Sequence, residues 1–111
     1  MHASFRAGAP VAVEYTASFV DGSGSKSLLP AMWERARPLL AGTFAPTLDE
    51  TAAAVRLLAT RARVVAEGAG GLALAAAMSG GAGARRVVCI VSGGNIDPAR
   101  LALILHGKTP A

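Results

Sequence analysis

Two short segments of the sequence combine polar side chains with glycines in arrangements that could serve chemistry. Glu67 follows an apolar run and precedes Gly68-Ala69-Gly70-Gly71, and Ser92-Gly93-Gly94-Asn95 follows a second apolar run. In α/β sheets, ligands bind beyond the carboxyl ends of the strands, and both segments are predicted to lie at such ends. The sequence therefore predicts a ligand site to which both segments contribute.

The Ser92-Gly93-Gly94-Asn95 segment has two interpretations. The hydroxyl of Ser92 can donate to or accept from a ring nitrogen or a phosphate, and the glycines let the backbone approach a ligand closely. Alternatively, the segment is a tight strand-to-helix turn in which Ser92 and Asn95 satisfy local backbone groups. The pattern alone leaves both open.

Glu67 also has two interpretations. Its carboxylate can serve a site as acid, base or hydrogen-bond acceptor, or it can simply lie at a helix N-terminus, where negative charge is stabilised. The glycines after it do not complete the Gly-x-Gly-x-x-Gly dinucleotide motif, because Ala73 stands where the last glycine is required. A dinucleotide site is not expected.

Other candidate motifs do not meet their requirements. The stretch Gly22-Ser23-Gly24-Ser25-Lys26-Ser27 looks like a phosphate loop, but it lacks the Walker spacing, and no covered strand immediately precedes it. His2 and His106 lie near opposite ends of the chain, and Cys89 is the only cysteine, so no residues have metal-ligand spacing. His106 is most simply a partner of a helix dipole, and no metal site is predicted.

Helices and strands that position the candidate site are predicted in alternation. Alternating apolar residues at 11–15 predict a short strand with one buried face, and the apolar run at 64–66 predicts a second short strand. The continuous apolar run at 87–91 predicts a strand covered on both faces. Gly8 predicts the end of a helix at 1–7, and Pro30 and Pro38 predict a short, distorted helix at 28–40. A capping box of Thr47 and Glu50 predicts a helix over 48–62, an alanine-rich helix is expected at 68–78, and Asp97 as N-cap with Pro98 starts a last helix that Gly107 closes. We therefore expect an α/β fold with short parallel strands and flanking helices.

Length and composition limit the classes of protein. A chain of 111 residues can form one domain, and its net charge of +4 is scattered rather than gathered into the basic stripe that nucleic-acid binding requires. No apolar stretch approaches the roughly 20 residues of a membrane span, and residues 1–6 lack a signal-peptide layout. The lone Cys89 excludes an internal disulfide and favours the cytoplasm.

Three blocks of sequence together resemble the C-terminal part of threonine ammonia-lyases and serine racemases. The blocks are Val20-Asp21-Gly22, the run from Val64 to Gly71 with the alanine-rich helix after it, and the run from Val88 to Asp97. Their order and spacing match over essentially the whole chain. The resemblance implies a fold-type II domain of the tryptophan synthase β-like kind, dependent on pyridoxal 5′-phosphate, of which residues 1–111 would form a single partial domain.

The resemblance also implies roles for individual residues. Ser92 would hydrogen-bond the pyridine nitrogen, Gly22 would border the cofactor, Glu67 would line the pocket near the ring, and Asn95 would support the turn. Gly71 stands where alanine is expected as often as glycine, a departure expected only to loosen the helix start. The reaction implied is the elimination of water and then ammonia from L-threonine or L-serine, which gives a 2-oxo acid.

The lysine that holds the cofactor covalently in this family lies in an N-terminal segment. The two lysines here, Lys26 and Lys108, do not match its position. We therefore expect the last third of an enzyme, inactive alone, with an upstream segment and further copies of itself as partners. The alternatives are a non-catalytic binding or oligomerisation module, or part of a serine racemase, which shares every motif named above.

Overall fold

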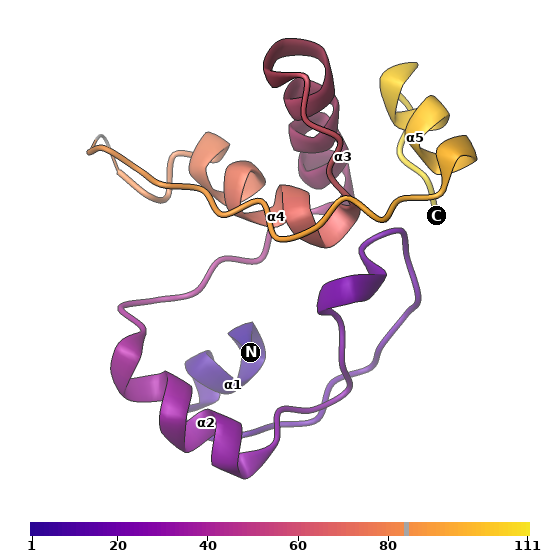
Figure 1. Ribbon diagram of the computed structural model, residues 1–111. Helices are drawn as coiled ribbons and strands as arrows, with labels where there is room; N and C mark the ends of the chain where they lie inside the picture. Colours follow the sequence, from indigo (N-terminus) through magenta and orange to yellow (C-terminus); the bar gives the residue numbers. More distant parts are fainter. Residues whose placement is uncertain (84) are drawn as a thin grey trace. The chain divides into compact units, whose positions relative to one another are not determined.

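The computed structural model describes residues 1–83 and 85–111, and these divide into two compact units. The first unit comprises Met1–Thr16 and Gly24–Ala45, and the second comprises Ala17–Ser23 and Pro46–Ala111. Short helices joined by extended segments make up both units (Figure 1). No helix of the described residues is long and apolar enough to cross a membrane. The expectation of a single partial domain stays a prediction.

The first unit contains two short helices whose ends follow the signals in the sequence. Helix α1 (His2–Ala7) stops at Gly8, which has the left-handed φ of 73° that glycine adopts without strain. Helix α2 (Pro30–Ala36) begins at Pro30 and passes into the 3₁₀ turn η2 (Arg37–Leu39). Trp33, which is buried, meets the ring of Phe5 edge to face at 6.4 Å between centroids. The predicted glycine cap and the distorted helix are thus confirmed.

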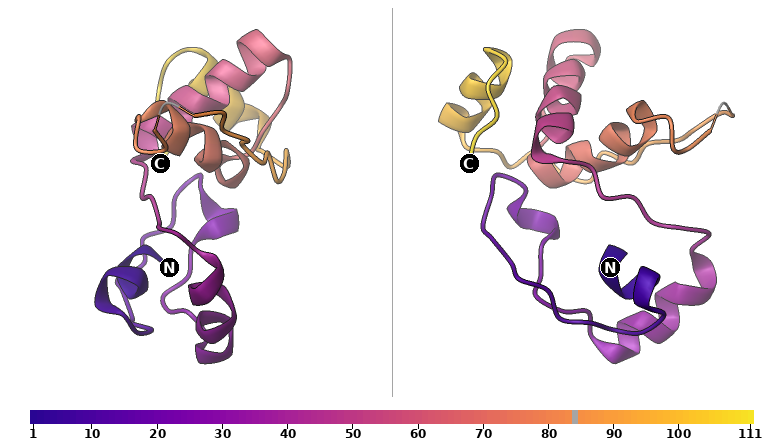
Figure 2. Two further views of the ribbon diagram at one scale, coloured as in Figure 1. Left: turned by 90° about the vertical axis from the view of Figure 1, so that its left-hand side faces the viewer. Right: turned by 180° about the vertical axis from the view of Figure 1, so that it is seen from behind.

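The second unit is built around α3 (Leu48–Leu57), which lies against α4 (Gly68–Met78) and α5 (Pro98–Leu105) (Figures 1 and 2). The predicted capping box is present at the start of α3, where Thr47 Oγ1 accepts from the Glu50 amide and the Glu50 carboxylate accepts from the Thr47 amide. The buried core consists of side chains from three parts of the chain, namely Phe19, Ala52, Val55 and Ile104.

The end of α3 differs from the single helix predicted over 48–62. After Leu57 the chain widens into a π-helical turn, η3 (Leu58–Ala62), and stops at Arg63, which has a left-handed φ of 60°. A π turn adds a residue to the helical repeat and so changes the direction in which the chain leaves the helix. The extended segment 64–66 follows directly.

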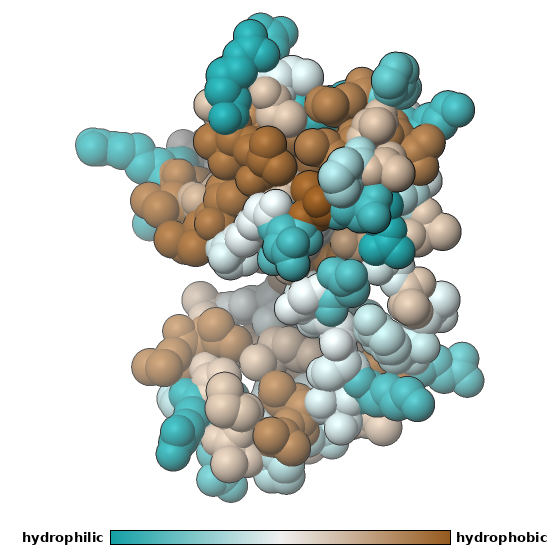
Figure 3. Space-filling view, turned by 45° about the vertical axis from the view of Figure 1, so that its right-hand side comes forward, coloured by the Kyte–Doolittle hydropathy of each residue, from teal (hydrophilic) through white to brown (hydrophobic). Residues whose placement is uncertain are grey.

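The predicted strands at 11–15, 64–66 and 87–91 are not formed within the described residues, although their backbones are extended. A strand needs a ladder of hydrogen bonds to a neighbour, and the extended segments meet only through single bonds, Val13 N–H to Lys26 O and Glu67 N–H to Gly93 O. Apolar residues predicted to be covered are therefore exposed, with Val88 at 84% and Ile90 at 69%. Apolar surface is broad over this unit in the upper part of Figure 3.

Candidate cofactor site

Three segments that are distant in the sequence meet in the second unit around the carboxylate of Glu67. The 3₁₀ turn η1 (Asp21–Ser23) contributes Gly22, where a Cβ atom would lie 3.6 Å from Glu67 Oε1 and 3.2 Å from Ala69 Cβ. The segment 92–95 contributes Gly93, where a Cβ atom would collide with the same oxygen. The structure therefore brings together the segments that carry Gly22, Glu67 and Ser92.

Close approach of backbones explains the glycines at this meeting point. A Cβ on Gly68 would lie 2.5 Å from Phe19 O, one on Gly70 would lie 2.5 Å from Gly93 O, and one on Gly94 would lie 2.6 Å from Val65 O. A Cβ atom essentially never lies within 3.0 Å of a heavy atom that is distant in the chain, so only glycine fits at these three positions without movement of the backbone. Gly93 and Gly94 thus pack against Glu67 and the segment before α4, which explains the two glycines by backbone packing.

Gly71 has a packing role that sequence reasoning missed. A Cβ at this position would lie 2.7 Å from Val55 Cγ2 and 3.5 Å from Thr51 O. Both contacts are to α3, so Gly71 lets α4 lie closer to α3 than an alanine would allow. The expected loosening of the start of α4 stays a prediction, and close packing against α3 is a second role for this glycine.

Glu67 occupies the N-cap position of α4, but its side chain does not cap the helix. Its amide donates to Gly93 O at 3.0 Å, and its carbonyl accepts from the Gly71 amide at 3.1 Å. Because its backbone N–H and C=O are both hydrogen-bonded, Glu67 is fixed in place. The residue is half-buried, and its carboxylate lies against Gly22 and Gly93. This arrangement leaves the carboxylate oxygens able to accept further hydrogen bonds.

Ser92 and Asn95 lie at the exposed side of this meeting point. Within the described residues, no hydrogen bond uses the Ser92 hydroxyl. A short turn follows in which the Ile96 amide donates to Gly94 O at 2.9 Å, and Asp97 then caps α5 by accepting from the amides of Ala99 and Arg100. The Asp97 cap and Pro98 start of α5 are confirmed.

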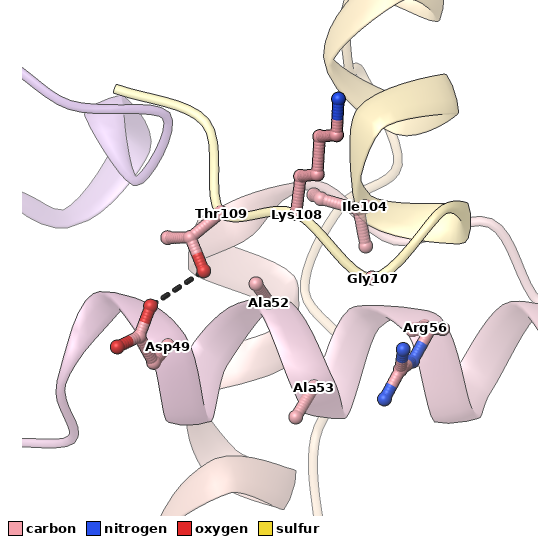
Figure 4. Close-up of a pocket in the computed structure, with 8 residues that line it drawn as sticks. All are labelled: Asp49, Ala52, Ala53, Arg56, Ile104, Gly107, Lys108 and Thr109. Atoms are coloured by element: carbon pink, nitrogen blue, oxygen red, sulfur yellow. Dashed lines mark hydrogen bonds between the residues drawn. The ribbon is translucent and has the colours of Figure 1, made fainter.

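Neither lysine is part of this arrangement. Lys26 belongs to the first unit. Lys108 lines a pocket of about 190 Å³ between α3 and α5, and Figure 4 shows its side chain pointing away from Arg56 and Asp49 there. Gly22, Glu67 and Ser92 do not line that pocket.

Comparison with known proteins places this geometry in a family. A family model described as "Pyridoxal-phosphate dependent enzyme" matches residues 1–93. The chain belongs to that family. The resemblance noted from the three blocks of sequence is thus confirmed, as are the cofactor class of the family and the fold-type II character of the domain, although the expected strands are not formed.

Threonine dehydratases are among the relatives. L-threonine dehydratase catabolic TdcB of Escherichia coli (strain K12) is 35% identical over 108 residues, which are 94% of this chain and 33% of that protein, and the proteins of strains O6:H1 and O157:H7 match equally. The crystal structure of a threonine deaminase from T.th. matches with a TM-score of 0.74 and 31% identity, over 86% of this chain and 33% of that one. The chain spans about a third of the length of the relatives it matches.

Proposed function

We propose that this chain is the segment of a pyridoxal-phosphate-dependent threonine or serine ammonia-lyase that contacts the cofactor ring. The observation that carries the proposal is the convergence of Gly22 and Gly93 on the carboxylate of Glu67, next to the exposed hydroxyl of Ser92. The matched threonine dehydratase and threonine deaminase support the substrate class, a hydroxy amino acid.

The residues present fit the cofactor. Pyridoxal phosphate, when bound, supplies an electron sink for the substrate. Ser92 offers an uncharged hydroxyl that can hydrogen-bond the pyridine nitrogen without holding it protonated, which suits elimination of a β-hydroxyl. Glu67, fixed by its two backbone bonds, lines the pocket near the ring, and Gly22, which packs closely against Glu67 and Ala69, borders the cofactor.

Further parts of the enzyme are included in this proposal. A lysine outside the described site holds the cofactor, and apolar strands from another part of a longer protein pair with the extended segments 64–66 and 87–91 to give a parallel sheet. The enzyme acts in the cytoplasm as a homo-oligomer. Exposure of Val88 and Ile90 supports the pairing, because an unpaired apolar edge otherwise invites association.

The test of the ring contact is a titration of the 111-residue chain with pyridoxine 5′-phosphate, followed by amide NMR. This probe lacks the aldehyde and so needs no lysine. We expect the amide signals of Gly22, Glu67 and Gly93 to shift. Ser92→Ala should weaken binding about 5-fold, the value of one hydrogen bond of about 1 kcal/mol. Equal binding by wild type and Ser92→Ala would contradict the assignment.

Ser79→Ala is the matched control, because Ser79 carries an exposed hydroxyl just beyond the other end of α4. It should bind as the wild type does. In a second experiment, pyridoxal phosphate is trapped with borohydride and the adducts are located by peptide mapping. A stoichiometric adduct on Lys26 that Ser92→Ala weakens would mean that the chain builds a complete site and is not a segment of one.

The reaction itself is tested in a chimera. The matching third of the E. coli threonine dehydratase is replaced by this chain, and release of 2-oxo acid and ammonia from L-threonine is measured. We expect activity that Ser92→Ala lowers and Ser79→Ala does not. A chimera that binds the cofactor but releases neither product from L-threonine or L-serine would refute the proposed reaction.

A further inference from the structure

An ion pair joins the η1 turn, which packs against Glu67, to α5, the helix that follows the Ser92 segment. Arg100 Nη1 lies 3.7 Å from Asp21 Oδ2, and the two side chains are 42% and 67% exposed. Asp21 is the first residue of η1 and directly precedes Gly22, whereas Arg100 lies in the first turn of α5. Neither residue was singled out as part of a site from the sequence.

Each partner of the pair is attached to one wall of the candidate site. Gly22, next to Asp21, packs against Glu67 and Ala69. Arg100 is joined to the segment 92–95 through Asp97, whose carboxylate accepts from the Arg100 amide at 3.2 Å. The pair therefore ties the η1 turn to the helix that continues from the Ser92 segment.

Apolar packing near the pair sets its geometry. Phe19 and Val20, immediately before Asp21, and Leu101, immediately after Arg100, belong to the same apolar cluster as Ile104. The backbones that carry the two charges are thus already held close together. An exposed pair of this kind adds little to overall stability. Its effect is expected locally, at the η1 turn that Asp21 begins.

We propose that Asp21 and Arg100 are positioning residues that hold Gly22 against the carboxylate of Glu67, and that the ion pair thereby makes cofactor-ring binding sensitive to salt. The second half of this inference rests on the proposed function. The Debye length falls from about 10 Å at 0.1 M to about 3 Å at 1 M ionic strength, which is shorter than the 3.7 Å of the pair. Molar salt should therefore weaken the pair and its hold on the η1 turn.

The experiment combines two measurements on the 111-residue chain. Without ligand, the amide shifts of Gly22 and Gly93 report the position of the turn. With pyridoxine 5′-phosphate, the dissociation constant reports ring binding. Asp21→Ala and Arg100→Ala should each move both amide signals and weaken binding about two- to five-fold at low salt, with an unchanged urea midpoint within error.

Two further variants separate positioning from simple charge. The double variant Asp21→Arg, Arg100→Asp keeps the net charge and reverses the pair, and it should restore the wild-type amide shifts and affinity. Arg56→Ala removes one exposed positive charge from α3 without touching the pair. It should leave the amide shifts of Gly22 and Gly93 unchanged. Any loss of affinity that Arg56→Ala causes therefore measures the effect of net charge alone.

The outcomes distinguish this inference from the proposed function. Single variants whose Gly22 and Gly93 shifts equal those of the wild type, or a reversed pair that fails to restore them, would overturn the positioning role. If the variants change the amide shifts as expected but the wild-type chain does not bind pyridoxine 5′-phosphate, the proposed ring site is refuted. The positioning role of Asp21 and Arg100 is then still supported. The salt sensitivity would be overturned if added salt raised the dissociation constant of the wild type no more than that of Arg100→Ala.

Discussion

Gly70→Ala tests whether backbone contact, rather than side-chain packing, holds the candidate site together. Gly70 is buried in the first turn of α4, and an added Cβ would lie 2.5 Å from Gly93 O and 3.3 Å from Gly93 N. An ordinary contact begins near 3.4 Å, so α4 and the segment 92–95 must separate by about 0.9 Å. The hydrogen bond from the Glu67 amide to Gly93 O, now 3.0 Å, lies in the path of that movement.

The expected magnitude follows from three contributions. Overpacking of a tight contact costs about 1–3 kcal/mol, and loss of the Glu67–Gly93 bond costs about 1 kcal/mol. Replacing glycine by alanine inside a helix offsets this by about 1 kcal/mol. We therefore expect Gly70→Ala to lower the free energy of unfolding by about 1–3 kcal/mol, even though the same change stabilises most helices.

Urea unfolding followed by circular dichroism at 222 nm measures the effect. Gly42→Ala is the matched control, because a Cβ there meets nothing within 4 Å and the backbone has no positive φ. It should change the free energy of unfolding by less than about 0.5 kcal/mol. A Gly70→Ala variant as stable as the wild type or more stable would show that α4 and Gly93 separate freely, and the argument for a backbone-built site would fail.

Three further predictions concern the rest of the chain. Arg63→Gly should raise the free energy of unfolding by about 1 kcal/mol in urea, because Arg63 has a left-handed φ of 60°. Arg61→Gly, within the π turn, should lower it, and the opposite result for the two variants would contradict the strain assigned to Arg63. Hydrogen bonds from the Thr47 amide and, second, the Thr47 hydroxyl lower the pKa of Glu50. The stabilising effect of the Glu50 carboxylate is therefore full above its unfolded-state pKa, about 4.3, and is lost as pH falls through the lower folded-state pKa. In Glu50→Gln, the urea midpoint should consequently fall less than in the wild type between pH 6 and pH 2.5. Sedimentation should show concentration-dependent association of the chain, reduced when Val88 and Ile90 are both changed to lysine; a monodisperse wild-type monomer would contradict it.

Helix ends were predictable because each depends on a few neighbouring residues. Gly8, the Thr47–Glu50 box and the Asp97–Pro98 start act through hydrogen bonds and fixed φ values within one turn, so the sequence alone contains their cause. The meeting of Gly22, Glu67 and the Ser92 segment was predictable in part. A shared site for Glu67 and the Ser92 segment followed from their places at the ends of two apolar runs. Gly22 was added only by the resemblance to a family.

Other contacts between distant segments could not be predicted. The apolar run at 87–91 has the composition of a covered strand, but a ladder depends on a partner that composition does not specify. The Asp21–Arg100 pair gave no local signal, because its partners belong to a turn and a helix that only the fold brings together. The role of Gly71 was missed for the same reason, since its cause lies in Val55 of another helix.

The core of the second unit has a consequence for how the chain acquires its structure. Phe19 comes from near the beginning of the sequence, Val55 from its middle and Ile104 from near its end, and all three are buried together. Contacts of such high sequence separation require closure of long loops, and proteins dominated by them fold slowly. During synthesis on the ribosome, α3 and α4 emerge well before α5. Until Ile104 is synthesised, their apolar faces remain exposed to solvent, and the turn that carries Gly22 cannot pack against a complete core.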